Sequence, residues 1–113
     1  FAVSQMVFDA EAYLRLRDRV ALRRALPITP GVMPVTNVRQ LTRMAELMGT
    51  PLPASFIDPL MAVADDAEAV REVGVELATA LSTRMLAEGA PGLHFITMNH
   101  STATLDVVQR LGL

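Results

Sequence analysis

The chain has 113 residues, no cysteine and a formal net charge of −2, and 51% of its residues are hydrophobic. This length allows one domain at most. The absence of cysteine excludes a disulfide framework and a cysteine-based metal site. All ten basic residues are arginines spread over several predicted helices, so no basic stripe indicates nucleic-acid binding.

Neither the apolar runs nor the first residues indicate a membrane protein or an exported one. No apolar run reaches the roughly 18 to 20 residues that a membrane span requires, and the first residues lack the charged region of a signal peptide. We therefore expect one cytoplasmic domain over residues 1–113, with no membrane and no nucleic acid among its partners.

The first predicted unit is a strand followed by a helix. The nearly continuous apolar run of residues 1–8 predicts a strand buried on both faces. Asp9 is a suitable N-cap, and we expect the helix that follows to end at Pro27. Its predicted buried stripe consists of Ala12, Leu16, Val20 and Arg23, with Tyr13 and Leu14 beside it.

The second predicted unit has a proline inside its strand. The strand covers about 28–33 and contains Pro30, which removes a donor from the ladder and therefore indicates a bulged barrel strand. Thr36 or Asn37 is expected to cap a helix that ends at Gly49. The buried stripe of this helix is predicted to consist of Val38, Leu41, Ala45 and Met48.

A longer connection precedes the third strand. Residues 51–64 contain three prolines, which indicates a short extra helix or a loop laid across one end of the sheet. Asp65 or Asp66 then opens the longest helix, which Gly89 ends. We expect Val70, Val73, Leu77, Leu81 and Met85 to form the buried stripe of this helix.

The last predicted unit is a strand over 93–98 and a helix capped by Asn99 or Ser101. The apolar stripe of this helix is Leu105, Val108 and Leu111. The predicted order is β-α-β-α-α-β-α, with the segment 51–64 as an insertion. This alternation is typical of an α/β fold with a parallel sheet and right-handed crossovers.

Three motifs lie in or after the predicted strands: SQMVFD at residues 4–9, PGVMPVTN at residues 30–37 and HFITMN at residues 94–99. Together they resemble the carboxyl-terminal part of the methylenetetrahydrofolate reductase family. The segments 88–95 and 101–104 resemble its actinobacterial members most. The resemblance implies the last three β/α units of a TIM (β/α)8 barrel, with an extra short helix between the second and third units. The chain has about half the length that a complete barrel requires.

The resemblance also implies an activity. Members of the family are oxidoreductases of one-carbon metabolism and methionine biosynthesis, and they reduce 5,10-methylenetetrahydrofolate to 5-methyltetrahydrofolate. Hydride passes from NADH or NADPH to FAD and then to the folate. The general acid and most FAD contacts of these flavoproteins fall outside the matched part, so the resemblance places no catalytic residue in this chain. The resemblance therefore implies that this chain is inactive when it is isolated from the rest of the enzyme.

The resemblance assigns substrate-binding roles to four residues. Gln5 matches a glutamine that contacts the folate pterin and the nicotinamide nucleotide in alternation, so it is also a cofactor-binding candidate. Gln40 matches a glutamine that hydrogen-bonds the folate, and Met44 stands where some members carry a phenylalanine. His100 departs from the pattern, since most relatives carry an arginine there.

Each candidate also has a structural interpretation. A glutamine in an apolar strand can satisfy backbone groups, Gln40 can be a surface residue, and Met44 can fill the core. His94 and His100 lack a carboxylate at ligand spacing, so no metal site is predicted.

A second hypothesis for the function stays open beside the enzyme. In it, this chain is a non-catalytic truncated barrel fragment that acts as a structural or assembly unit. Three strands leave two sheet edges free, which the remainder of the barrel or a homo-oligomer partner would cover. A phosphate-binding barrel of another kind lacks support, because no glycine-rich turn precedes a helix near the last two strands.

Overall fold

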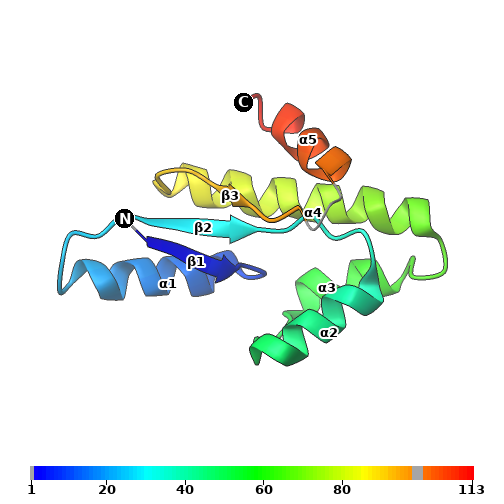
Figure 1. Cartoon of the computed structure of the whole chain (residues 1–113), viewed down its shortest axis with the longest axis horizontal. Helices are drawn as coiled ribbons and strands as arrows, with labels where there is room; N and C mark the ends of the chain where they lie inside the picture. Colours follow the sequence, from blue (N-terminus) through cyan, green and yellow to red (C-terminus); the bar gives the residue numbers. More distant parts are fainter. Residues whose placement is uncertain (1, 98–100) are drawn as a thin grey trace.

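Three parallel strands form one sheet in the order β1-β2-β3, as Figure 1 shows. The computed structural model describes residues 2–97 and 102–113, together with the backbone of residue 101. Within this part of the chain, no helix is long and apolar enough to cross a membrane. The strands are β1 (Ala2–Met6), β2 (Ile28–Val32) and β3 (His94–Phe95). The helices are α1 (Ala10–Ala21), α2 (Val38–Met48), α3 (Ala54–Met61), α4 (Ala67–Ala87) and α5 (Ser101–Arg110).

The observed element order is β-α-β-α-α-α-β-α. It confirms the predicted α/β class with parallel strands. The proline-rich insertion is a helix, α3, and Pro59 lies inside it. Strand β3 covers less than the predicted strand over 93–98: among the described residues, His94 pairs with Gly31 and Phe95 with Val32.

Helices α1, α4 and α5 cover one face of the sheet. Ile28 and Val32 of β2 point to this face and belong to a buried cluster with residues from all three helices. The other face is uncovered: Val3 is 46% exposed, and Gln5 and His94 are exposed as well. The prediction that the first strand is buried on both faces is therefore wrong, because the described chain supplies no layer for the second face.

A second buried cluster lies at the carboxyl ends of the strands. It joins residues that follow β1 and β2 to helices α2, α3 and α4, and Figure 1 shows α2 and α3 at this end of the sheet. The rings of Phe8 and Phe56 stack at a tilt with centroids 5.3 Å apart, a favourable aromatic distance. The buried members of the cluster are Phe8, Met33, Val35, Leu41, Phe56, Leu60 and Val70.

The pairing of β1 with β2 is irregular next to Pro30. Val3 pairs with Thr29 and Met6 with Gly31. Between these two pairs β1 contains one more residue than β2. Pro30 has no N–H to donate. The N–H of the next residue, Gly31, donates to the side-chain hydroxyl of Ser4 at 3.1 Å. The sheet is irregular where the proline predicted a bulge, but the extra residue lies in the neighbouring strand.

The predicted helix caps are confirmed wherever the structure describes them. The carboxylate of Asp9 accepts from the Glu11 N–H, and that of Asp66 accepts from the N–H groups of Glu68 and Ala69. Asn37 caps α2 through the Gln40 N–H, at 3.0 Å. The predicted caps at Asn99 and Ser101 involve side chains outside the described residues.

Two predicted features of α1 are wrong in detail, whereas in α4 the predicted residues Val70 and Met85 are buried. Helix α1 ends at Ala21, well before Pro27, because the chain needs residues 22–27 to turn back into β2. Its buried residues are Tyr13 and Leu14, while Leu16 is 41% exposed. In α4 and α5 the most deeply buried positions include small side chains, which let these helices pack closely. These positions are Gly74, Ala78, Ser82, Ala103 and Thr104.

Tyr13 anchors α1 to the sheet, and its removal should weaken the fold. Its hydroxyl is buried and donates to the Ile28 carbonyl oxygen at 2.7 Å. In Tyr13→Phe this carbonyl loses its side-chain partner, so we expect a loss of about 1 to 2 kcal/mol in the free energy of unfolding. Urea unfolding, monitored by circular dichroism, measures this loss of stability. An unchanged midpoint of unfolding would contradict the anchoring role.

The same hydroxyl predicts a loss of stability at alkaline pH. Burial raises the pKa of Tyr13 above its ordinary value of 10.0, and the positive charge of Arg17 partly offsets this rise. The folded chain therefore holds the proton more tightly than the unfolded chain, so stability falls as the pH rises above 10.0. The chain has one tyrosine, and the sequence contains no lysine to titrate in this range. The alkaline loss should be absent in Tyr13→Phe.

Candidate functional site

The carboxyl ends of β1 and β2 lie side by side at one edge of the sheet. In parallel α/β folds this edge carries the functional groups, because the loops that leave the strands meet there. Here residues 7–9 lead from β1 into α1, and residues 33–37 lead from β2 into α2. The candidate residues Gln5 and Gln40 lie close in sequence to these two loops.

Gln5 is exposed and lies in the irregular part of β1. Its carbonyl oxygen accepts from the Ser4 hydroxyl at 2.8 Å, and this hydroxyl also accepts from the Gly31 N–H. The backbone at Gln5 is thus held in place, and Gln5 lines an open cleft of about 580 Å³. The other walls of this cleft are residues 6–9, one side of α1 that includes Leu16, and the segment 50–53.

Gln40 and Met44 lie one helical turn apart on α2. Both are partly buried, and Met44 packs against the second buried cluster. At helical spacing they share the same flank of α2. The position of Met44 agrees with a structural role in the core, while Gln40 sits in the first turn beside the Asn37 cap.

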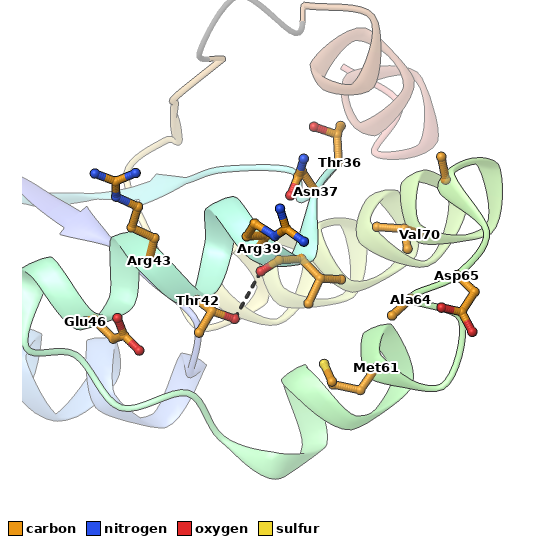
Figure 2. A pocket seen from close by; sticks show the side chains of 12 residues that line it. Thr36, Asn37, Arg39, Thr42, Arg43, Glu46, Met61, Ala64, Asp65 and Val70 are labelled. Carbon is orange, nitrogen blue, oxygen red and sulfur yellow. Dashed lines mark hydrogen bonds between the residues drawn. The ribbon is translucent and has the colours of Figure 1, made fainter.

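A second cleft, of about 910 Å³, lies on the other flank of α2. Figure 2 shows Arg39 and Arg43 on the α2 side and Met61 and Asp65 on the side of α3 and its connection to α4. Neither arginine forms an ion pair with any residue that the structure describes. The hydroxyl of Thr42 donates to the Val38 carbonyl oxygen in the preceding turn of the same helix, at 3.0 Å.

Among the described residues, the structure does not bring the three candidates Gln5, Gln40 and Met44 into one cavity. Gln5 lines the 580 Å³ cleft, and neither Gln40 nor Met44 is among the described residues that line either cleft. His100 lies outside the described residues. In the part of the chain that is described, no three side chains of His, Cys, Asp or Glu are grouped to hold a metal ion.

The comparison with known proteins decides the family. The family model described as "Methylenetetrahydrofolate reductase" matches residues 1–112. The chain belongs to the methylenetetrahydrofolate reductase family. It is 40% identical over 114 residues to "Methylenetetrahydrofolate reductase 1" of Schizosaccharomyces pombe, a match that covers 100% of the chain. It is 33% identical over 112 residues to "5,10-methylenetetrahydrofolate reductase" of Escherichia coli and 32% identical over 112 residues to "Methylenetetrahydrofolate reductase (NADH) 1" of Arabidopsis thaliana. Each of these two matches covers 98% of the chain.

The chain corresponds to a minor part of these reductases. It spans 19% of the Schizosaccharomyces pombe and Arabidopsis thaliana proteins and 38% of the Escherichia coli protein. The uncovered face of the sheet agrees with this partial coverage, because a parallel sheet is normally covered on both faces. The predicted resemblance to the reductase family is confirmed along the whole chain.

Sequence reasoning missed two features of this reductase segment. The first is Ser4, whose hydroxyl joins β1 to Gly31 of β2. A serine before a glutamine in an apolar strand gives no signal of such a bridge, because the bridge depends on which residue of the neighbouring strand lies opposite. The second is the arginine-lined cleft. Its signal was available, since Arg39 and Arg43 are four residues apart and share one side of a helix.

Proposed function

We propose that this chain supplies the folate and nicotinamide side of a methylenetetrahydrofolate reductase. In this proposal the complete enzyme reduces 5,10-methylenetetrahydrofolate to 5-methyltetrahydrofolate, with NADH or NADPH as the hydride donor. The three strands correspond to strands six to eight of its barrel, and α3 is an insertion between the second and third units. The family match over residues 1–112 is the observation that carries the proposal.

Gln5 is the residue to which the proposal assigns the most specific role. Its amide can donate and accept hydrogen bonds, so one side chain can serve a pterin and a nicotinamide in turn. It lines a cleft of about 580 Å³, a volume within the usual range for small-molecule sites. The walls at Phe8 and Leu16 are apolar, which suits the flat face of a ring. Ser4 holds the backbone of Gln5 and acts as a positioning residue.

The remaining candidates would act from α2. Gln40 would hydrogen-bond the folate from the first turn of the helix. Met44, which packs against the second buried cluster, would fix the position of that turn and offer an apolar edge to the ligand. His100 would approach the ligand after β3, where it can provide less charge than an arginine.

The family also implies FAD, which accepts hydride from the nicotinamide and passes it on when bound. The cleft around Gln5 is a poor fit for the diphosphate of FAD. Arg15 is the one basic residue among its described lining residues, so no second arginine lines the cleft to bind a diphosphate together with it. We therefore derive no step through FAD from this chain and propose that its contacts lie in the rest of the enzyme.

A structural or assembly role is the second candidate function. The uncovered sheet face, on which Val3 is 46% exposed, favours it because such a surface is normally covered by further protein. In this role Gln5 would contact protein instead of a ligand. The two functions differ in whether the chain itself recognises a folate.

Titration with 5-methyltetrahydrofolate separates the two functions. We expect saturable binding by fluorescence, weakened about two- to tenfold in Gln5→Ala, since a lost hydrogen bond to a ligand contributes about 0.5 to 1.5 kcal/mol. In a longer protein that contains this chain, folate reduction should slow by a similar factor.

Gln109→Ala is the matched control for this titration. Gln109 is exposed on α5 and does not line the cleft around Gln5, so its truncation should leave binding unchanged. A wild-type chain that melts cooperatively but does not bind 5-methyltetrahydrofolate would favour the assembly role. Equal binding by wild type and Gln5→Ala would overturn the assignment of Gln5.

A further inference from the structure

A cluster of exposed arginines surrounds an exposed leucine where α1 ends. Leu22 is 86% exposed, directly after the last residue of α1. The arginines around it are exposed and have no ion-pair partner among the residues that the structure describes. We call this surface the basic end, and it consists of Arg19, Leu22, Arg23 and Arg24.

A surface of the opposite charge lies around the connection from α3 to α4. Met61 is 56% exposed there, and the acidic residues near it are exposed too. The sequence from 44 to 70 contains five acidic residues and no basic one. We call this surface the acidic end, and it consists of Asp58, Met61, Asp65, Asp66 and Glu68.

The two surfaces lie at opposite ends of the molecule. Figure 1 shows the connection from α1 to β2 at one end of the longest axis and the connection from α3 to α4 at the other. The Cα atoms extend 46 Å along this axis, against 31 Å and 23 Å along the others. The chain therefore carries separated charges of opposite sign although its net charge is only −2.

Helix electrostatics account for part of this pattern. Arg19 lies in the last turn of α1 and Glu68 in the first turn of α4, and these positions favour a basic and an acidic residue. Asp66 serves as an N-cap. The helix dipoles do not explain why Leu22 and Met61 are exposed at the centres of the two charged surfaces.

We propose that the basic end of one copy of this chain binds the acidic end of a second copy. Each surface has an apolar centre and a charged rim, which is the usual arrangement of a protein interface. The rims have opposite signs, so contact between unlike ends is attractive and contact between like ends is repulsive. Other acidic proteins would also satisfy the basic end, but the chain itself carries both complementary surfaces.

The proposed contact joins different surfaces of the two copies. A contact of this type leaves an unused surface on each molecule, so association continues into open chains unless a ring closes. Arg39 and Arg43 line the wall of the cleft that faces Met61 and Asp65. Arg39 and Arg43 repel the arginines of an approaching basic end. The contact is therefore restricted to the part of the acidic end that faces away from this cleft.

Sedimentation velocity over a range of protein concentrations tests the contact. At roughly 20 mM salt the average mass should rise with concentration and reach no plateau. At roughly 500 mM salt the association should weaken about tenfold or more, since screening shortens the reach of exposed charges. A wild-type chain that stays monomeric at low salt up to millimolar concentration would overturn the proposal.

Charge reversal provides the sharper test. Arg19→Glu with Arg23→Glu makes both ends acidic, and Asp65→Arg with Glu68→Arg leaves the acidic end without net charge, so each variant alone should be monomeric. An equimolar mixture of the two variants should associate again, because each variant retains one native end. A mixture that stays monomeric, or single variants that associate as the wild type does, would contradict the proposed pairing.

Two controls keep this test interpretable. Glu76→Arg makes the charge change of Asp65→Arg at an exposed position in the middle of α4, and it should associate as the wild type does. Circular dichroism verifies folding of every variant. If Arg19→Glu disturbs α1, then Arg23→Glu with Arg24→Glu makes the same charge change beyond the end of the helix.

Discussion

Gly74→Ala is expected to lower the free energy of unfolding by roughly 2 kcal/mol or more. A Cβ atom at this position would lie 1.8 Å from the Val35 carbonyl oxygen and 2.8 Å from its carbon, whereas carbon atoms in contact prefer about 3.5 to 4.0 Å. The obstacle is backbone, so α4 must move away from the segment after β2. Alanine gains about 1 kcal/mol of helix propensity over glycine, and we expect overpacking to exceed this gain.

Gly92→Ala is the matched control for this substitution. A Cβ atom on Gly92 meets no atom within 4 Å, so the change should be nearly neutral. Urea unfolding of both variants, followed by circular dichroism, measures the difference. Equal midpoints for Gly74→Ala and the wild type would show that α4 does not pack against Val35 as described.

Leu41→Ala should cost about 2 to 5 kcal/mol, the range for a fully buried leucine. Leu41 is 0% exposed and lies in the second cluster, where it fastens α2 to the carboxyl end of the sheet. The adjacent residue, Gln40, is a proposed folate ligand. Loosening of α2 should therefore also weaken the binding of 5-methyltetrahydrofolate.

Leu47→Ala is the matched control, because Leu47 is 78% exposed on the same helix. It should change stability by less than about 0.5 kcal/mol. Thermal melts and folate titrations of the two variants give both readouts. If Leu41→Ala and Leu47→Ala proved equally mild, the second cluster could not be what holds α2.

The boundaries of helices were predictable because local chemistry sets them. Asp9, Asn37 and Asp66 cap α1, α2 and α4 as predicted. Gly49 ends α2 with φ of +65°, where glycine avoids strain. The end of α1 was not predictable from Pro27 alone, because the path of the chain back into β2 decides where that helix stops.

The buried faces of the helices were harder to predict. Hydrophobic periodicity favours large side chains, yet α4 turns Gly74 and Ser82 toward the core. Small residues allow close helix packing, and their burial depends on which partner lies opposite. For the same reason Leu105, part of the predicted apolar stripe of the last helix, is 58% exposed, while Ala103 is buried.

The candidate site was predictable only through its motifs. Periodicity alone does not distinguish Gln5 or Gln40 from ordinary polar residues. The structure places Gln5 in a cleft and Met44 against the core. In the proposed function the site also uses other parts of the reductase, and the titrations above test its ligands.

The extra residue in β1 also bears on how readily this edge of the sheet would seed fibrils. A free strand edge with regular spacing is a template for β-strands of other molecules. In β1 the pairing register changes between Val3 and Met6, and the Ser4 hydroxyl bonds to the Gly31 N–H across the gap. A foreign strand would meet uneven spacing along this edge. The irregular spacing of β1 thus makes this edge a poor seed for cross-β growth, even though Val3 is exposed beside it.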